Sequence, residues 1–286
     1  PQSDKKYTVE YIEPNGNILY KNTILTNNWI KLNREFYTKY TIKVWDNDKL
    51  IFIDETNLEN KRVFISFESH SLGDTIAWMP YCLEFKNKHN CHVIVSCKWS
   101  EFFQDEYPEI EFVPIGSTVH NLHAMYKLGW FWNKDKEPEL CNTIPLQKTA
   151  TNILGLNYFE IQPKIRFEQK ERLIKEKYIA IATHSTSGLK YWNYPNGWQQ
   201  LVDTLILSGY KVISISKEKS ELKNVTDLED TSIENTMNVI YHSEFFIGLS
   251  SGLSWLSWAI GKHVVMISNF TESDHEFTSN TTRITN

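Results

Sequence analysis

The pattern of apolar and polar residues changes at about residue 60. Before that point, apolar and polar residues alternate over short stretches, which is typical of strands buried on one face. Turn-forming residues separate these stretches, for example Pro-Asn-Gly-Asn at 14–17. We therefore expect residues 1–60 to form a small β-rich module, a sandwich or barrel-like arrangement of antiparallel strands that serves packing or acceptor docking. The strands are expected at residues 7–12, 18–20, 40–45 and 50–53.

Continuous apolar runs replace the alternation in the rest of the chain. A run such as 62–67 is typical of a parallel strand buried on both faces. The alternation of such runs with helical segments predicts an α/β protein with two Rossmann-like lobes, over residues 61–160 and 161–286. The stretch 116–160 is less regular, with a helix start at 149–154. Further strands are expected at residues 91–96, 110–113, 178–183, 211–215, 245–249 and 263–267, and helices at 74–88, 99–106, 195–208, 232–241 and 253–260.

Composition narrows the class of protein. The chain of 286 residues is 41% hydrophobic and 23% charged, which is typical of a globular protein. Its net charge is −5 and it has no long basic run, which argues against nucleic acid or an anionic membrane as the main partner. No apolar run reaches the roughly 18 residues of a membrane span, and no signal-peptide pattern opens the chain. We therefore expect a cytoplasmic location.

The four cysteines have no metal-site spacing. They stand at positions 82, 91, 97 and 141, without a Cys-x-x-Cys pair. We expect buried or free thiols in a reducing compartment, and no metal site in this chain.

Three polar loops follow predicted buried strands, at the strand ends where ligands bind in open α/β sheets. The first loop contains Gly73, which permits a tight turn, and Asp74, which begins a helix. Asp74 can cap this helix, or act as a general base that takes a proton from an acceptor hydroxyl. The helix dipole is expected to lower its pKa. His70, in the same loop, is the next candidate base.

The other two loops are suited to phosphate. In the second, Ser185, Thr186 and neighbouring hydroxyls surround Lys190, a set that can bind a diphosphate or simply form a surface loop with a solvated lysine. In the third, a Ser-Ser-Gly-Leu turn at 250–253 precedes a helix. Backbone N–H groups at a helix N-terminus bind anions, although a serine cap on a glycine turn explains the same residues.

Two resemblances follow from these motifs. Leu72-Gly73-Asp74 with Pro80, and Lys190-Tyr191-Trp192 with the segment 198–212, resemble the lipopolysaccharide heptosyltransferase superfamily. The run 251–259 and the β-rich N-terminal segment resemble more closely the bacterial autotransporter O-heptosyltransferases. Ser250 and Trp255 stand where the superfamily more usually has Asp and His. The resemblance covers roughly residues 5–286.

This resemblance implies a GT-B type fold and inverting transfer of heptose from ADP-heptose to a protein serine. Asp74 would be the catalytic base, and Lys190 would hold the donor diphosphate. Ser216 or Glu218 would meet the ribose hydroxyls. The three loops contain no Asp-x-Asp motif, so metal-independent transfer is expected. The donor phosphate and sugar would be lined by Ser250, Ser251, Gly252 and Leu253.

The resemblance also leaves alternatives open. Members of the group carry an iron-binding cysteine finger just beyond the point that matches residues 283–286, where this chain ends. The second lobe is therefore expected to be truncated, and neither the iron site nor a finger-mediated oligomer is expected from these residues, although a homo-oligomer stays open. The alternatives are a transferase that uses another nucleotide sugar or a glycan acceptor, a non-catalytic sugar-nucleotide-binding protein, and a structural scaffold.

Overall fold

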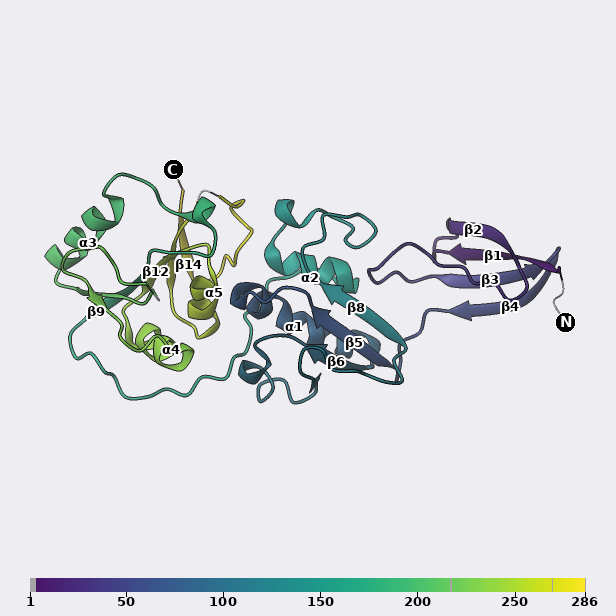
Figure 1. Ribbon diagram of the computed structural model, residues 1–286, viewed down its shortest axis with the longest axis horizontal. Coiled ribbons are helices and arrows are strands. Elements are labelled where there is room, and N and C mark those ends of the chain that lie inside the picture. The colour runs from purple at the N-terminus through teal and green to yellow at the C-terminus, as the bar shows by residue number, and fades with distance from the viewer. Residues whose placement is uncertain (1–3, 217, 269, 286) are drawn as a thin grey trace.

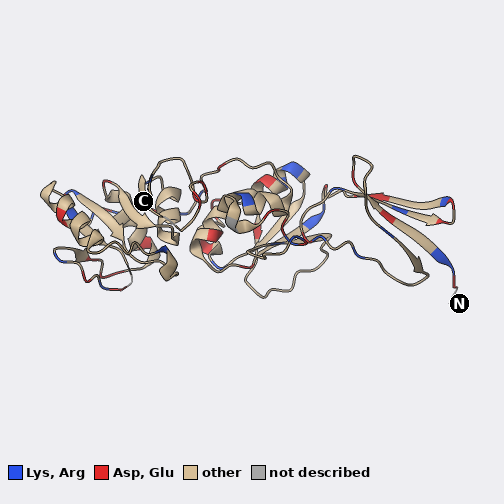
Figure 2. Ribbon diagram, turned by 90° about the horizontal axis from the view of Figure 1, so that it is seen from above, with Lys and Arg blue, Asp and Glu red and all other residues tan. Residues whose placement is uncertain are grey.

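The protein has three sheets that follow one another along its long axis (Figure 1). A computed structural model describes residues 4–216, 218–268 and 270–285. We call the part with β5–β8 and α1–α2 the middle lobe, and the part with β9–β14 and α3–α5 the C-terminal lobe. Acidic and basic residues are interspersed along both lobes (Figure 2).

The N-terminal sheet contains the four antiparallel strands that the alternation predicts. Their order is β2-β1-β3-β4, and all described residues of these strands lie in one open sheet. The expectation of a sandwich or barrel-like module is therefore wrong for this part of the chain. Both edge strands, β2 and β4, are largely exposed. The strands are β1 (Lys6–Ile12), β2 (Ile18–Leu25), β3 (Thr41–Asp46) and β4 (Lys49–Glu55).

The middle lobe has a parallel sheet of order β7-β6-β5-β8. Strand β8 lies in the stretch that we expected to be irregular, and it pairs in register with β5, with Phe67 opposite Leu128. The loops that follow these two strands are therefore neighbours. The elements are β5 (Arg62–Phe67), α1 (Leu72–His89), β6 (His92–Ser96), η1 (Ser100–Phe102), β7 (Glu111–Phe112), β8 (Ala124–Leu128), η2 (Cys141–Thr143) and α2 (Leu146–Leu154).

The C-terminal lobe has six parallel strands in the order β11-β10-β9-β12-β13-β14. The edge strands β11 and β14 were not predicted, because they are short and carry no apolar run. The elements are β9 (Tyr178–Ala182), η3 (Gly188–Lys190), α3 (Gly197–Leu207), β10 (Lys211–Ser214), β11 (Thr226–Asp227), α4 (Ile233–His242), β12 (Phe246–Leu249), α5 (Gly252–Ala259), β13 (Val264–Ile267) and β14 (Thr281–Ile284).

The two lobes meet where α1 and α5 begin. A Cβ added to Gly73 would lie 3.1 Å from the Trp255 ring and 3.4 Å from Gly252 Cα. Gly73 therefore lies inside α1 and permits this close approach of two helices, rather than forming the expected turn. One cluster of buried side chains continues across both lobes and includes Trp78 and Trp258.

The cysteines and the helices of the described ranges bear on the compositional expectations. All four cysteines are buried and free, as predicted. Within the described ranges, no helix is both long and apolar enough to cross a membrane.

Candidate active site

A cavity of about 460 Å³ lies at the junction of the two lobes. The N-terminal ends of α1 and α5 line this cavity together with the loop after β9. It therefore collects parts of all three loops that the sequence singled out. The predicted site residues that line it are Gly73, Asp74, Ser185, Thr186, Lys190, Ser250, Ser251 and Gly252.

Four predicted residues do not line this cavity. His70 is exposed, and its carbonyl oxygen accepts the Trp99 indole N–H at 3.0 Å. Leu253 packs against the core. Ser216 is buried just beyond the end of β10, and Glu218 is exposed two residues later. The structure thus brings together the glycine-containing first turns of α1 and α5 and the Lys190 loop, but not these four side chains.

Asp74 does not cap its helix. The N-cap of α1 is Ser71, whose Oγ accepts the Asp74 backbone N–H at 3.5 Å, so the capping alternative for Asp74 is wrong. The Asp74 carboxylate instead accepts two hydrogen bonds on one oxygen, Oδ2, from Ser69 Oγ at 2.5 Å and from Trp130 Nε1 at 3.0 Å. Oδ1 makes no hydrogen bond to the described residues. One carboxylate oxygen is therefore held in place, and the other is available at the cavity.

Burial raises the pKa of Asp74 above its ordinary value. The hydrogen bonds from Ser69 and Trp130, and the nearby Lys190 and His275, act in the opposite direction but are weaker. The expectation that the helix dipole sets a lowered pKa is therefore wrong, because loss of solvation outweighs the interactions that favour the charged form. A carboxylate with a raised pKa is also the better proton acceptor.

The N-terminus of α5 has neither an acidic side chain in its first turn nor a side-chain cap. Ser251 is its N-cap, but Ser251 Oγ caps no backbone N–H, is buried, and has no hydrogen-bond partner among the described residues. The first turn contains no acidic residue. Backbone N–H groups of a first helical turn lack partners within the helix. This end of α5 can therefore receive an anion.

Lys190 supplies positive charge at the same place. It ends the short helix η3 and lines the cavity, and no carboxylate among the described residues lies within 4.0 Å of its Nζ. Ser185, from the same loop, donates a hydrogen bond to the Ser250 carbonyl at 3.4 Å, which ties the β9 loop to the α5 turn. An anion at α5 would thus also meet a lysine.

Sequence reasoning missed Trp130 and His275. His275 is buried, its Nδ1 lies 3.1 Å from the Ile144 carbonyl oxygen, and its ring centroid is 5.8 Å from that of Trp130. Both line the cavity beside Asp74. The aromatic run 130–132 after a short apolar stretch was the available signal for Trp130, whereas nothing local marks His275.

A buried ion pair forms another part of the wall. Glu276 lines the cavity although its side chain is 1% exposed, and it pairs with Arg283 of β14. Arg283 also donates to the Thr271 carbonyl at 2.8 Å, and Thr271 Oγ1 donates to Glu276. These bonds fix the segment 270–276 that carries His275.

The chain is similar in sequence to known heptosyltransferases. Residues 144–285 match the sequence profile of glycosyltransferase family 9 (heptosyltransferase). The chain is 34% identical over 284 residues to the autotransporter heptosyltransferase Aah of Escherichia coli, covering 93% of this chain and 72% of that protein. It is 32% identical over 281 residues to the autotransporter heptosyltransferase BAHTCr of Citrobacter rodentium, covering 92% and 68%.

Solved structures agree with this similarity. The crystal structure of TibC, an iron-containing dodecameric glycosyltransferase from enterotoxigenic E. coli, matches with a TM-score of 0.89 at 26% identity, over 99% of this chain and 78% of that one. A second TibC structure contains ADP-D-beta-D-heptose. The E. coli ADP-heptose lipopolysaccharide heptosyltransferase II shares the fold, with a TM-score of 0.56 at 11% identity, over 77% of this chain and 89% of that one. The α/β fold with two parallel sheets, similar to GT-B heptosyltransferases, is therefore confirmed, and the chain belongs to the autotransporter heptosyltransferase family of glycosyltransferases.

Proposed function

We propose that the chain transfers heptose from ADP-heptose to a serine hydroxyl of an autotransporter protein, with inversion at the anomeric carbon and without a catalytic metal ion. The observation that carries the proposal is a single cavity with a free carboxylate oxygen of Asp74 and the anion-receiving end of α5 beside Lys190. The donor that is bound to the relative TibC supports the choice of ADP-heptose.

The donor diphosphate would bind to the C-terminal lobe. The N–H groups at the start of α5 would donate to one phosphate, and Ser251 Oγ, which has no partner among the described residues, would donate as well. Lys190 would contribute a charge-assisted hydrogen bond. Negative charge grows on the departing ADP during transfer, so these groups would stabilise the transition state more than the bound donor.

The acceptor would bind on the side of Asp74. The hydroxyl oxygen would form a bond to the anomeric carbon while the bond from that carbon to the phosphate oxygen breaks. The hydroxyl proton would pass to Asp74 Oδ1, and ADP would leave on the opposite side. A single displacement of this kind inverts the configuration. Ser69 and Trp130 would hold the other carboxylate oxygen and so keep Oδ1 directed at the acceptor.

The relative TibC differs from the described part of this chain in its metal. TibC is described as iron-containing and dodecameric. Over the described ranges of this chain, no group of three or more His, Cys, Asp or Glu side chains is placed to hold a metal ion, so no step of the proposal uses iron. We also propose that the chain forms a homo-oligomer, which light scattering of the purified protein would test.

The direct test is a transfer assay with an unglycosylated autotransporter passenger fragment. ADP-heptose and a panel of other sugar nucleotides would be compared, with mass spectrometry to locate the sugar and NMR to assign the anomeric configuration. We expect transfer from ADP-heptose to serine, with inversion, and undiminished in EDTA. Turnover only with another donor would contradict the heptose assignment, and loss of turnover in EDTA would contradict metal independence. Donor binding without any turnover would favour the non-catalytic alternative.

A further inference from the structure

Trp132 has a backbone conformation that is unusual for its side chain. Nine non-glycine residues of the described chain have a positive φ; eight are asparagine and the ninth is Trp132, with a φ of 53°. Asparagine tolerates the left-handed region because its short polar side chain can hydrogen-bond locally, whereas a bulky side chain is strained there. Strain of this kind persists where the surroundings impose it, and it gathers at functional positions.

The loop around Trp132 imposes this conformation. Its backbone N–H donates to Glu137 Oε1 at 2.8 Å, and Glu137 is only 1% exposed. The loop is also fixed from outside, because Lys136 pairs with Glu35 at 3.5 Å and lies 5.2 Å from the centre of the Phe131 ring. A buried carboxylate is thus used to hold one backbone N–H in a strained turn.

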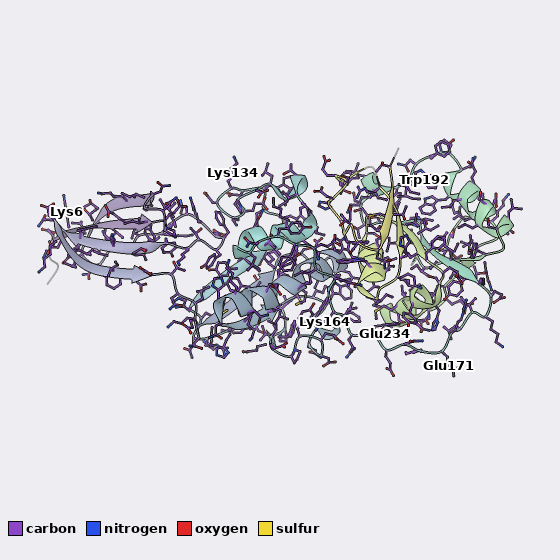
Figure 3. The ribbon with its side chains drawn as sticks, turned by 180° about the vertical axis from the view of Figure 1, so that it is seen from behind. Lys6, Lys134, Lys164, Glu171, Trp192 and Glu234 are labelled. Atoms are coloured by element: carbon purple, nitrogen blue, oxygen red, sulfur yellow. The ribbon has the colours of Figure 1, made fainter. Side chains whose placement is uncertain are left out.

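The consequence is an indole displayed at the cavity. Trp132 lines the cavity and is nevertheless 59% exposed, so it stands at the mouth. Trp130, two residues earlier, holds Asp74. Figure 3 shows Lys134, two residues later, on the middle lobe and on the same side of the molecule as Trp192 of the C-terminal lobe. Trp130 and Trp132 therefore connect the proposed base to the mouth of the cavity.

We propose that the Trp132 indole is a binding platform for the acceptor polypeptide, on which residues that flank the reacting hydroxyl stack. This inference rests on the proposed function. Trp132 belongs to the middle lobe, as Asp74 does, whereas Lys190 and α5, the groups suited to the donor phosphates, belong to the C-terminal lobe. A tryptophan offers a large apolar face and one N–H donor with few rotatable bonds, which suits recognition of a polypeptide.

Trp132→Asn tests the proposal, because asparagine fits the left-handed backbone but removes the ring. We expect a melting temperature equal to or above that of the unaltered chain. The KM for an unglycosylated autotransporter passenger fragment should rise about threefold to tenfold, at saturating ADP-heptose. The donor Kd, measured by calorimetry, and kcat should change less than twofold. Trp132→Phe keeps a ring and should recover part of the acceptor affinity.

Phe159→Ala is the matched control, since Phe159 is 52% exposed and does not line the cavity. It should leave the acceptor KM unchanged. An unchanged acceptor KM in Trp132→Asn would overturn the proposal. A rise in the donor Kd in place of the acceptor KM would assign the ring to the donor sugar and would also overturn it. If the unaltered chain transfers heptose to no acceptor, the proposed function itself fails, and this inference fails with it.

Discussion

The N-terminal ends of α1 and α5 are built in nearly the same way but differ in charge. The first turn of α1 contains a carboxylate, whereas that of α5 contains none. Each helix follows a buried parallel strand, each has a serine N-cap, and their first turns meet through Gly73 and Gly252. In α1 the cap forms, and Asp74 in the first turn places a carboxylate at the cavity. In α5 the serine caps no N–H, and the first turn is free of acidic residues.

This difference explains how one local motif can supply two functions. The positive end of a helix dipole favours an anion. In α1 the chain itself provides the anion, which in the proposed reaction receives a proton. The N-terminus of α5 has no such carboxylate, and in the proposed reaction the diphosphate of the donor binds there. The close packing of the two glycines lets these two helix ends act on one bound molecule.

Asp74→Asn should have the largest effect. It keeps the shape of the side chain but removes the proton acceptor, so kcat should fall at least about a hundredfold. Donor affinity should stay near that of the unaltered chain. The melting temperature should not fall: burial raises the pKa of Asp74, so the ionised carboxylate opposes folding at neutral pH, and asparagine removes that charge.

Activity of the Asp74→Asn protein is measured with the passenger fragment at saturating donor. Full activity in a protein that melts at the normal temperature would remove Asp74 from the mechanism.

Lys190→Ala should have the next largest effect, on binding instead of chemistry. It removes the charge-assisted hydrogen bond that we propose Lys190 makes to the diphosphate, worth on the order of 1.5–3 kcal/mol. The donor Kd should therefore rise about tenfold to a hundredfold. Calorimetry with ADP-heptose measures this, and an unchanged Kd would show that Lys190 is an ordinary surface residue.

Ser251→Asp makes the start of α5 resemble that of α1. Aspartate can cap a helix, but Ser251 Oγ is buried, so the added charge should lower the melting temperature modestly. The added charge should repel the diphosphate and raise the donor Kd about tenfold. Ser251→Asn is the matched control, since asparagine caps equally well without charge and should bind the donor nearly as the unaltered chain does. Equal Kd values for the two variants would argue against an anion site at α5.

Trp130→Phe should change the pH dependence more than the rate. In the proposed reaction Asp74 must be ionised. The value of kcat/KM should therefore fall as the pH drops through the pKa of this group, which burial raises above the ordinary aspartate value of about 3.9. Removing the Trp130 N–H removes a bond that favours the ionised form. The pKa of Asp74 should rise further, and the acidic limb of the profile should move to higher pH.

The control for this shift is Trp99→Phe. The Trp99 indole N–H donates to the carbonyl of His70, which lies in the loop that precedes Asp74. This N–H makes no hydrogen bond to Asp74. The pH profile of the Trp99→Phe variant should match that of the unaltered chain. Coincident profiles for both variants would contradict the positioning role of Trp130.

The sequence predicted those features that depend on local patterns. Buried parallel strands have continuous apolar runs, so the sequence predicted most of the strands. It therefore also predicted the loops after them, which contain Asp74 and Lys190. Strand β8 was missed because its pattern, Ala-Met-Tyr-Lys-Leu, is neither continuously apolar nor clearly alternating. Without β8, the aromatic run that follows it could not be placed beside Asp74.

The remaining misses depend on tertiary structure. The expected pKa of Asp74 considered only its own helix, whereas burial between two lobes sets the direction of the shift. His275 reaches the cavity through a loop anchored by a buried ion pair with β14, which no sequence spacing reveals. Ser216 and Glu218 were expected to meet the ribose hydroxyls because they follow a predicted strand, but neither residue lines the cavity.

A crystal structure with ADP-heptose bound tests the central claim most directly. We expect the diphosphate to lie against the first turn of α5 and within hydrogen-bond distance of Lys190 Nζ. The anomeric carbon of the heptose should lie on the side of Asp74, with room for a hydroxyl between that carbon and Oδ1. A donor bound outside this cavity, or one whose diphosphate contacts neither α5 nor Lys190, would contradict this claim.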